Sequence, residues 1–510
     1  MTANALVPEA FKDLVNLAAD VLGTFVLYAT DDYFAEKENL LKPGPAEWRE
    51  GAYTDKGKWM DGWESQRRRT PGHDFCIVRL GAPGEIHGAL VDTTHFKGNA
   101  PQQVQLEGID ASHLASVDEL NASEAWFEVL PKGAVKPDFQ NVLVAAAPSK
   151  RCTHVRLRIY PDGGVARLRV YGKVLPDPRL FRRPGSIDLA AVENGGRVVL
   201  ESDQFFGPAA NLLLPGRGVN MGDGWETKRR RTPGSDWCVI ALGRRGVIER
   251  IELDTHYFKG NAPQATRIEA LDAKNPDEKQ LASPEGWTTL IDEAPLVQHR
   301  RHLLEPGLRK RVTHVRVHMF PHGGINRMRM FGFADELPFE ASKMKKLDAL
   351  KGKDFTQLML SFCGSKAFAK FVAAEKPLEC TRTLFKTVDR AFAAMTTKDW
   401  LEAFAAHPQI GAQKKAETAT ERSGTWSKGE QSKVGEASEL TKEKLRLLNG
   451  EYYDKFGFIF ICFATGRSAE QMLQLLERRV QRTRAEELQT AALEQAAITR
   501  LRIDKWLEGK

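Results

Sequence analysis

The feature that most constrains this chain is a long internal repeat. Residues 61–102 and 223–264 align without a gap, and 25 of these 42 positions are identical. Similarity continues on both sides of the block, pairing 31–41 with 202–213 and 153–172 with 313–332. Self-similarity over so long a period indicates two copies of one structural unit, and because only two copies are present the unit is a duplicated domain and not a solenoid.

Each copy reads as a series of short β-strands. In the first copy Val155, Leu157 and Ile159 alternate with His154, Arg156 and Arg158, which is the period-two pattern of a strand. The turn signal Pro-Asp-Gly-Gly follows at 161–164, and alternation resumes over 167–171, so this stretch predicts a β-hairpin. Short strands separated by Gly and Pro predict a β-sandwich of the jelly-roll kind.

Three further segments complete the predicted organisation. Phe11, Leu14, Val15 and Ala18 have helical spacing and predict a short helix in the first 20 residues. Residues 339–350 are rich in Lys and predict a linker. Beyond 351 Gly and Pro thin out and helical spacing takes over, which predicts an all-α bundle. We therefore expect jelly rolls over 1–175 and 176–338 and a helical domain over 351–510. A fragment of 1–340 and a fragment of 345–510 are each expected to fold alone.

Composition narrows the class of protein. A net charge of +7 with interspersed signs gives little support to nucleic-acid binding and suits small anionic substrates. Six cysteines in 510 residues form no disulfide framework, which favours a reducing compartment. The N-terminus lacks a secretory apolar region, and no run of 18 apolar residues exists. We expect a cytoplasmic homo-oligomer that acts on small molecules, without membrane or nucleic-acid partners.

The first duplicated motif is Gly-Trp-Glu followed by three arginines. Its glutamates, Glu64 and Glu226, are candidate catalytic groups, and an arginine can bind a carboxylate through two parallel hydrogen bonds. The alternative is that the arginines pair with nearby acids or are solvated. The candidate carboxylate ligands are Arg67, Arg68, Arg229 and Arg230.

The second duplicated motif runs from Asp-Thr to Phe-Lys-Gly-Asn. Asp92 and Asp254 are candidate acids or bases, and with His95 and His256 they are also candidate metal ligands. Asn99 and Asn261 offer the donors and acceptor that match an amide or ureido group. A third pair, His154 and His314, begins the basic strand faces, where a substrate contact and a structural role are equally open.

These motifs, all in duplicate, resemble those of the allantoicase family over about 1–338. The resemblance implies two jelly-roll domains of the galactose-binding type and hydrolysis of allantoate to ureidoglycolate and urea. A divalent metal that polarises the ureido oxygen is one expectation for this half.

A different set of motifs lies in the helical part. His407 is followed by Pro408 at a predicted helix end, and Ser427, Glu430 and Gln431 open another helix. The apolar stretch 456–465 then leads to Gly466 and Arg467. Together these resemble the decarboxylase of 2-oxo-4-hydroxy-4-carboxy-5-ureidoimidazoline (OHCU).

The OHCU resemblance implies a reaction without metal or organic cofactor that gives (S)-allantoin. By the same resemblance His407 and Glu430 are catalytic, while Ser427, Gln431, Pro408 and Arg467 bind substrate.

Two functions remain open at this point. One is a bifunctional purine-catabolic enzyme that acts on allantoate and OHCU. The other is a single-activity OHCU decarboxylase whose jelly rolls form a ligand-binding module, since jelly rolls host many functions. Release of urea from allantoate separates the two.

Overall fold

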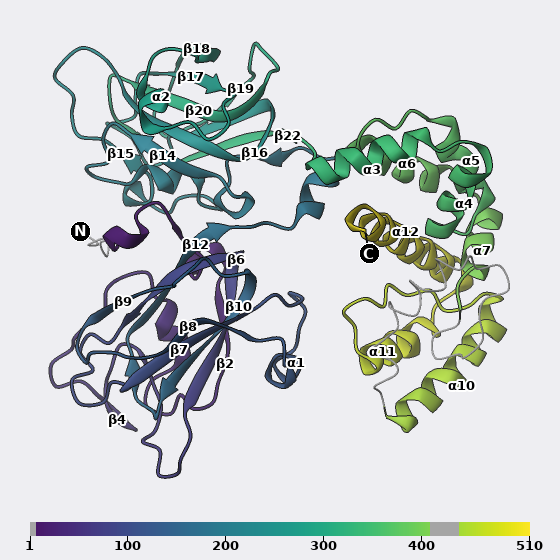
Figure 1. The fold of residues 1–510 in the computed structure, drawn as a ribbon, viewed down its shortest axis with the longest axis horizontal. Helices are drawn as coiled ribbons and strands as arrows, with labels where there is room; N and C mark the ends of the chain where they lie inside the picture. Colours follow the sequence, from purple (N-terminus) through teal and green to yellow (C-terminus); the bar gives the residue numbers. More distant parts are fainter. Residues whose placement is uncertain (1–6, 409–437, 510) are drawn as a thin grey trace. The chain divides into compact units, whose positions relative to one another are not determined.

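A computed structural model of the protein describes residues 7–408 and 438–509. The chain divides into two compact units. The first comprises Met1–Asp177 and Ser186–Asp335 and holds both copies of the repeat, and the second comprises Pro178–Gly185 and Glu336–Lys510. The β-strands belong to the first unit and the long helices to the second (Figure 1).

The first copy is an antiparallel β-domain built around the long strand β6 (Asp74–Asp92). Strands β12 and β10 pair with opposite edges of β6, while β2 and β9 also pair with it and extend the domain. The other strands are β1 Val15–Asn16, β2 Phe25–Ala29, β3 Tyr53–Thr54, β4 Gly57–Lys58, β5 Trp63–Glu64, β7 Gln103–Ile109, β8 Phe127–Ala134, β9 Gln140–Val144, β10 Arg151–Tyr160, β11 Gly164–Val165 and β12 Arg167–Val174. A short helix, α1 (Val117–Ala122), precedes β8.

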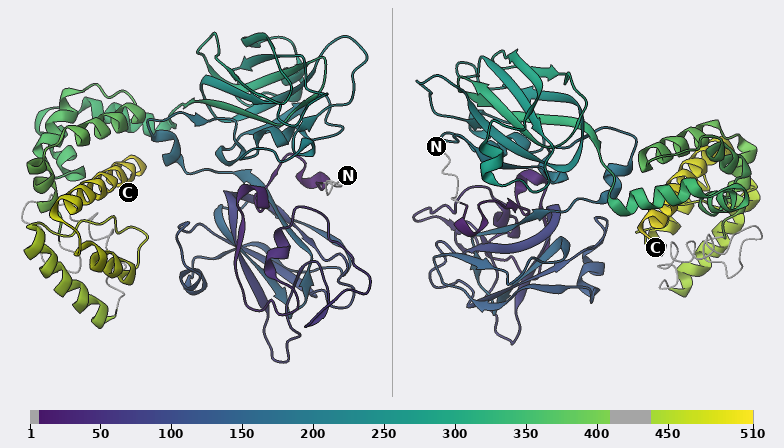
Figure 2. Two further views of the ribbon diagram at one scale, coloured as in Figure 1. Left: turned by 180° about the vertical axis from the view of Figure 1, so that it is seen from behind. Right: turned by 45° about the horizontal axis from the view of Figure 1, so that its top comes forward.

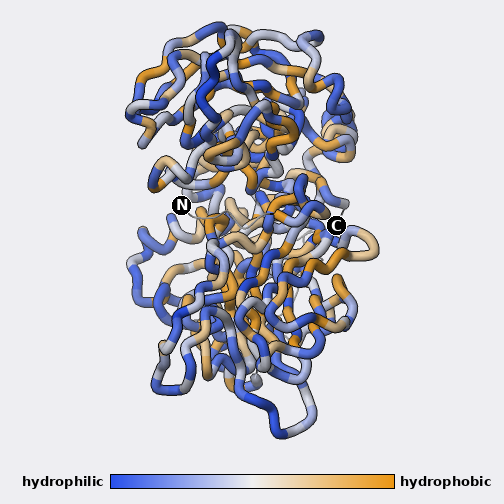
Figure 3. The backbone as a smooth tube through the Cα atoms, turned by 90° about the vertical axis from the view of Figure 1, so that its left-hand side faces the viewer, coloured by the Kyte–Doolittle hydropathy of each residue, from blue (hydrophilic) through white to orange (hydrophobic). Residues whose placement is uncertain are grey.

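The second copy repeats this topology around β16 (Asp236–Asp254). Its strands are β13 Ile187–Asp188, β14 Arg197–Glu201, β15 Trp225–Glu226, β17 Ala265–Leu271, β18 Thr288–Pro295, β19 Arg301–Leu304, β20 Arg311–Phe320, β21 Gly324–Ile325 and β22 Arg327–Ala334, with α2 at Glu278–Ala282. Each copy has its own apolar core with a fully buried tryptophan, Trp63 or Trp225. Apolar segments run through the interior of the copies and polar segments dominate the loops (Figure 3).

The helical unit is arranged around its last helix, α12 (Arg484–Glu508). Helices α3, α4, α6, α7 and α10 all contact α12, which lies along the inner side of the arc that α3 to α7 form (Figures 1 and 2). The helices before it are α3 Pro338–Ala349, α4 Gly352–Phe362, α5 Lys366–Ala374, α6 Thr381–Ala394, α7 Thr397–Ala405, α10 Glu439–Phe456 and α11 Ala469–Arg479. In residues 7–408 and 438–509 no helix is long and apolar enough to cross a bilayer.

A segment between the two repeats is built into the helical unit. The Arg182 side chain is 1% exposed, and its Nε donates to Glu340 Oε1 of α3 at 2.6 Å. Its Nη1 donates to Asp504 Oδ1 of α12 at 2.9 Å. Arg183 binds the second oxygen of Asp504 and lies over the Phe385 ring at 4.3 Å. We call residues 178–185, held in this way, the clasp segment.

The predicted fold class, two antiparallel β-domains of the jelly-roll kind followed by an all-α domain, is confirmed. Three local predictions are wrong. Of the first 20 residues, the described ones, 7–20, form a 3₁₀ turn at Glu9–Phe11 and strand β1 and not an α-helix, since Phe11 packs on Tyr171 of β12. Strands β10 and β12 are not a hairpin, because β6 lies between them. Residues 339–350 are not a linker but form most of α3, whose Met344 and Leu347 are fully buried.

Candidate active sites

Three separate motifs of the first copy meet at Glu64. Strand β5 pairs Glu64 with Gly164 of the Pro-Asp-Gly-Gly turn, and the Gly164 N–H donates to the Asn99 carbonyl at 2.7 Å. The Asn99 side-chain amide in turn donates to Glu64 Oε1 at 2.6 Å. Glycine is required at 164 because a Cβ atom there would lie 2.0 Å from the Phe96 ring. The turn thus fixes the catalytic candidates Glu64 and Asn99 against each other.

Glu64 and Asn99 line a cavity of about 340 Å³. Burial raises the pKa of the Glu64 carboxyl, and the hydrogen bond from Asn99 offsets this only in part. A carboxyl whose pKa is raised in a cavity is suited to donate and recover a proton. The remaining lining consists of two lysines, a histidine and apolar walls, namely Lys58, Lys97, His95, Phe34, Trp48, Met60, Gly57 and Gly98.

The second copy repeats the central geometry. Strand β15 pairs Glu226 with Gly324, the Gly324 N–H donates to the Asn261 carbonyl at 2.9 Å, and the Asn261 amide donates to Glu226 Oε1. Burial likewise raises the pKa of Glu226.

The arginines of the first motif divide into two kinds. Arg68 donates to the buried Asp74 carboxylate at 2.7 Å, and Arg230 does the same to Asp236. These two therefore fix the loop, as the alternative reading of the motif held. Arg67 and Arg229 are exposed, and no polar contact of either side chain is present in residues 7–408 and 438–509. Of the four candidate carboxylate ligands, they are the two that stand free toward solvent.

The predicted metal ligands are engaged elsewhere. Asp92 is 3% exposed and accepts from the N–H and hydroxyl of Thr94, and Asp254 accepts from the His256 N–H and from Arg217. His95 lies on the cavity wall beside Trp48, whereas His256 stacks on His299 with ring centroids 4.0 Å apart. Within the part of the chain that the structure describes, no group of three or more His, Cys, Asp or Glu is placed to hold a metal ion.

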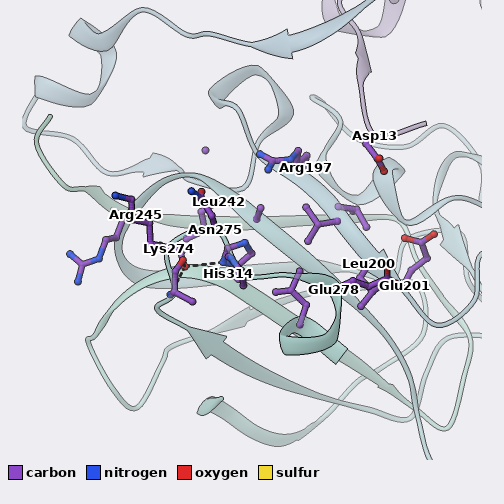
Figure 4. Close-up of a pocket in the computed structure, with 18 of the residues that line it drawn as sticks. Asp13, Arg197, Leu200, Glu201, Leu242, Arg245, Lys274, Asn275, Glu278 and His314 are labelled. Atoms are coloured by element: carbon purple, nitrogen blue, oxygen red, sulfur yellow. Dashed lines mark hydrogen bonds between the residues drawn. The ribbon is translucent and has the colours of Figure 1, made fainter. Parts of the chain in front are cut away.

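His154 and His314 lie away from the two glutamates. His314 lies near the start of β20, whereas Phe320, at the other end of this strand, is close to the segment that carries Asn261. The six residue steps between His314 and Phe320 span about 20 Å. Burial, with Arg79 or Arg197 nearby, lowers the pKa of each histidine to about 4. His154 is fully buried, while His314 lines a separate pocket of about 1190 Å³ with Arg197, Glu201 and Lys274 (Figure 4). Neither histidine shares the cavity at Glu64.

In the helical unit, His407 follows directly after α7, as predicted for a helix end. Its Nε2 is closed off from solvent and has no hydrogen-bond partner in residues 7–408 and 438–509. Burial and the charge of Arg502 lower the pKa of His407 to about 3, against an opposing contribution from Gln495. Gln495 and Arg502, both buried on α12, therefore set the protonation of this imidazole.

The other helical candidates are placed only in part. Pro408 follows His407 directly, and Arg467 precedes α11 with its Nη1 3.5 Å from Cys462 Sγ. Ser427, Glu430 and Gln431 lie outside the described residues. The buried carboxylate Glu487 accepts from Tyr452 and Arg479 and is a structural centre of this unit.

Several residues of these sites carry no signal in the repeat alignment. Trp48 and Lys58 belong to a stretch without a counterpart in the second copy, so comparison of the copies passes over them. Gln495 and Arg502 lie on a long helix whose spacing predicts only a helix. Lys97, by contrast, does carry a signal, because it belongs to the duplicated Phe-Lys-Gly-Asn string that also contains Asn99.

Comparison with known families separates the two β-copies from the helical part of the chain. A family model described as "Allantoicase repeat" matches residues 15–175 and 187–335, and one described as "OHCU decarboxylase" matches residues 348–504. An allantoicase of Dictyostelium discoideum is 44% identical over 327 residues, which cover 63% of this chain and 88% of the relative.

Two solved structures are similar to separate parts. The allantoicase of Saccharomyces cerevisiae is 36% identical, with a TM-score of 0.53, over 63% of this chain and 93% of its own. An OHCU decarboxylase crystallised in the presence of (S)-allantoin is 35% identical, with a TM-score of 0.26, over 31% of this chain and 99% of its own.

Proposed function

Because the chain belongs to the allantoicase family and carries an OHCU decarboxylase domain, we propose that its two units catalyse two separate steps of ureide breakdown. The first unit hydrolyses allantoate to ureidoglycolate and urea, and the second decarboxylates OHCU to (S)-allantoin. The observation that carries the first assignment is the half-buried Glu64 carboxyl, held by Asn99 on the wall of a cavity. Allantoin must be ring-opened before the first unit can use it, so the product of one unit is not the substrate of the other.

Glu64 supplies the proton transfers that the allantoate reaction needs. Allantoate carries a carboxylate and two ureido groups on one carbon. Protonated Glu64 donates to the nitrogen of the leaving ureido group while the nitrogen of the other group forms a double bond to that carbon, and urea departs. The Glu64 carboxylate then takes a proton from water, whose oxygen adds to the carbon and yields ureidoglycolate. Glu64 ends the cycle protonated, as its raised pKa favours.

The rest of the cavity matches the substrate. Lys58 and Lys97 place two positive charges for the allantoate carboxylate, with Arg67 exposed on the loop after Glu64. The Asn99 side-chain amide donates to the Glu64 carboxyl and the Asn99 backbone carbonyl accepts from the Gly164 N–H, so Asn99 positions Glu64 against the turn. We route no step through a metal, since Asp92 and Asp254 are engaged by their neighbours.

His407 is the acid/base group proposed for the decarboxylase. Burial and Arg502 keep its imidazole neutral, so it can accept a proton from the substrate and return it to one face of the ring. The family resemblance assigns Glu430 and Gln431 to the ring and its hydroxyl, with Ser427 supporting them, and Arg467 to an oxygen-rich arm. Loss of CO2 leaves negative charge that the adjacent ring C=N can accept, so the reaction needs no organic cofactor.

Both activities are tested on the full chain. Purified protein should release urea from allantoate and convert OHCU to optically active allantoin. Normal decarboxylation without any urea release would refute the allantoicase assignment and favour a ligand-binding role for the β-domains. The Glu64→Gln, Glu226→Gln double variant should lose urea release while it retains decarboxylation. An unfolding midpoint of its β-unit equal to that of the unmodified chain serves as the folding control, because the cores of the two units are separate.

A further inference from the structure

The two copies of the repeat share their glutamate and asparagine but not the surroundings of these residues. Leu41 aligns with Leu213 and Asp61 with Asp223, and the stretch between them is ten residues longer in the first copy. We call residues 45–59 of this longer stretch the inserted segment. It contains β3 and β4, and Trp48 and Lys58 from it line the cavity at Glu64.

The inserted segment is anchored at its base and along its length. Asp61, which is 4% exposed, accepts from the Glu47 N–H at 2.9 Å and from Lys42 and Arg167. The Lys58 ammonium lies 4.1 Å from the Trp48 ring centroid, so the cation and the aromatic wall hold each other in place. The segment is therefore a formed wall of the cavity and not a loose loop.

The second copy leaves the same region open. Phe206, the counterpart of Phe34, is 61% exposed, whereas Phe34 is half-buried on the cavity wall. Val219 on the shorter stretch is 70% exposed, compared with 43% for Trp48 of the inserted segment. The Met221 sulfur lies 3.9 Å from the Asn261 amide. The second copy keeps Lys259, aligned with Lys97, but has no counterpart of Lys58.

This difference bears directly on catalysis. Proton transfer and charge stabilisation are more effective where water is excluded and where both charges of the site are fixed in advance. The first copy offers a cavity lined by Lys58, Lys97 and the half-buried Glu64 carboxyl, and the second leaves the apolar side chains of Phe206 and Val219 exposed. A small anion with a single carboxylate finds its full set of partners in the first copy.

We propose that the first copy is the one that turns over allantoate, and that the inserted segment sets its specificity through Trp48 and Lys58. The inference rests on the proposed allantoicase function and refines it. It assigns the burial of the ureido arms to Trp48 and part of the carboxylate binding to Lys58.

Single variants of the two glutamates give the first test. Glu64→Gln removes the transferable proton, so kcat for urea release should fall about 10²–10⁴-fold. Glu226→Gln should cost at least tenfold less than that. Equal losses in the two variants, or a larger loss in Glu226→Gln, would overturn the inference. Absence of urea release from the unmodified chain would instead overturn the proposed function.

Variants of the inserted segment give the second test. Lys58→Met and Trp48→Ala should each raise KM for allantoate about tenfold or more, with a smaller effect on kcat, because they remove contacts and not the acid. Tyr53→Ala is the matched control, since Tyr53 lies on the same hairpin, is 72% exposed and does not line the cavity. The unfolding midpoint of the β-unit, compared with that of the unmodified chain, controls for folding. If Lys58→Met and Trp48→Ala behave like Tyr53→Ala, the segment has no role in specificity and the inference fails.

Discussion

The clasp segment should determine the stability of the helical unit, and Arg182 is the residue that tests it. The Arg182 side chain is 1% exposed, and two of the three carboxylates it binds, Glu340 and Asp504, are 1% and 3% exposed. Replacement by methionine keeps most of the side-chain length but leaves both buried carboxylates without this cation. Loss of one partner of a buried ion pair costs about 3–5 kcal/mol, and we expect Arg182→Met to destabilise the helical unit by that amount.

Hydrogen exchange during denaturant unfolding of the full chain measures this effect locally. Peptides from α3 and α12 should lose protection at lower denaturant in Arg182→Met, while peptides from β6 and β16 stay unchanged, because their cores are separate. Arg309→Met is the control, since Arg309 is 71% exposed and its ion pair with Glu249 should contribute less than about 1 kcal/mol.

The pH dependence of the Arg182 variant gives a second readout. Burial already raises the pKa of Asp504, and removal of Arg182 should raise it further. An acid with a raised pKa in the folded state gains relative stability as pH falls, because the folded state then takes up the proton more readily. The deficit of Arg182→Met should therefore shrink between pH 7 and pH 4. Identical unfolding midpoints for Arg182→Met and Arg309→Met at pH 7 would refute the role of the clasp.

Four further outcomes follow from the two units. His407→Asn should slow enzymatic OHCU decarboxylation about 10²–10⁴-fold and give near-racemic allantoin, which optical rotation of the product measures; fast formation of (S)-allantoin would contradict the assignment. The kcat/KM for urea release should fall as pH rises through the pKa of Glu64, which burial raises above its ordinary 4.5, and a profile unaltered in Glu64→Gln would exclude Glu64 as the acid. Burial lowers the pKa of His154 to about 4, so as pH falls below 6.5 this residue takes up a proton in the unfolded chain before it does so in the folded one. The free energy of unfolding of the β-unit should therefore fall by roughly 3 kcal/mol between pH 6.5 and 4 because of this residue. His154→Leu should flatten that pH dependence in urea unfolding curves. Arg67→Lys should raise KM for allantoate, whereas Arg68→Lys should mainly lower the unfolding midpoint, because Arg68 is bound to Asp74; the opposite pattern would reverse their roles.

The duplication made much of the β-unit predictable from sequence. Identical strings in two copies identified Glu64 and Asn99 as separate candidates. The bond between them was not predictable, because the motifs lie 35 residues apart and meet only through the turn at Gly164. Alternation along β10 was also readable, because Val155, Leu157 and Ile159 all face one core. The pairing of the strands was not predictable, because nothing in the sequence of β10 and β12 shows that β6 lies between them in the sheet.

The helical unit was harder to delimit for a physical reason. A lysine-rich surface made 339–350 look like a linker, yet Met344 and Leu347 on the other face of α3 are fully buried. The clasp segment belongs to this unit only through side chains that meet across 322 residues, from Arg182 to Asp504. Contacts of that range leave no local pattern. A fragment that begins at 345 would lack both the clasp segment and Glu340, so a fragment from 336 with residues 178–185 supplied is the better independent unit.

The arginine beside each buried histidine comes from a different strand in the two copies. In the first copy β6 supplies Arg79, opposite Phe25 of β2, and in the second β14 supplies Arg197, opposite Ala241 of β16. A chimera that moved β14 alone into the first copy would set two arginines against each other, and the reverse exchange would leave His314 without this cation. An exchange between the copies therefore keeps one arginine beside each histidine only when both strands are exchanged together.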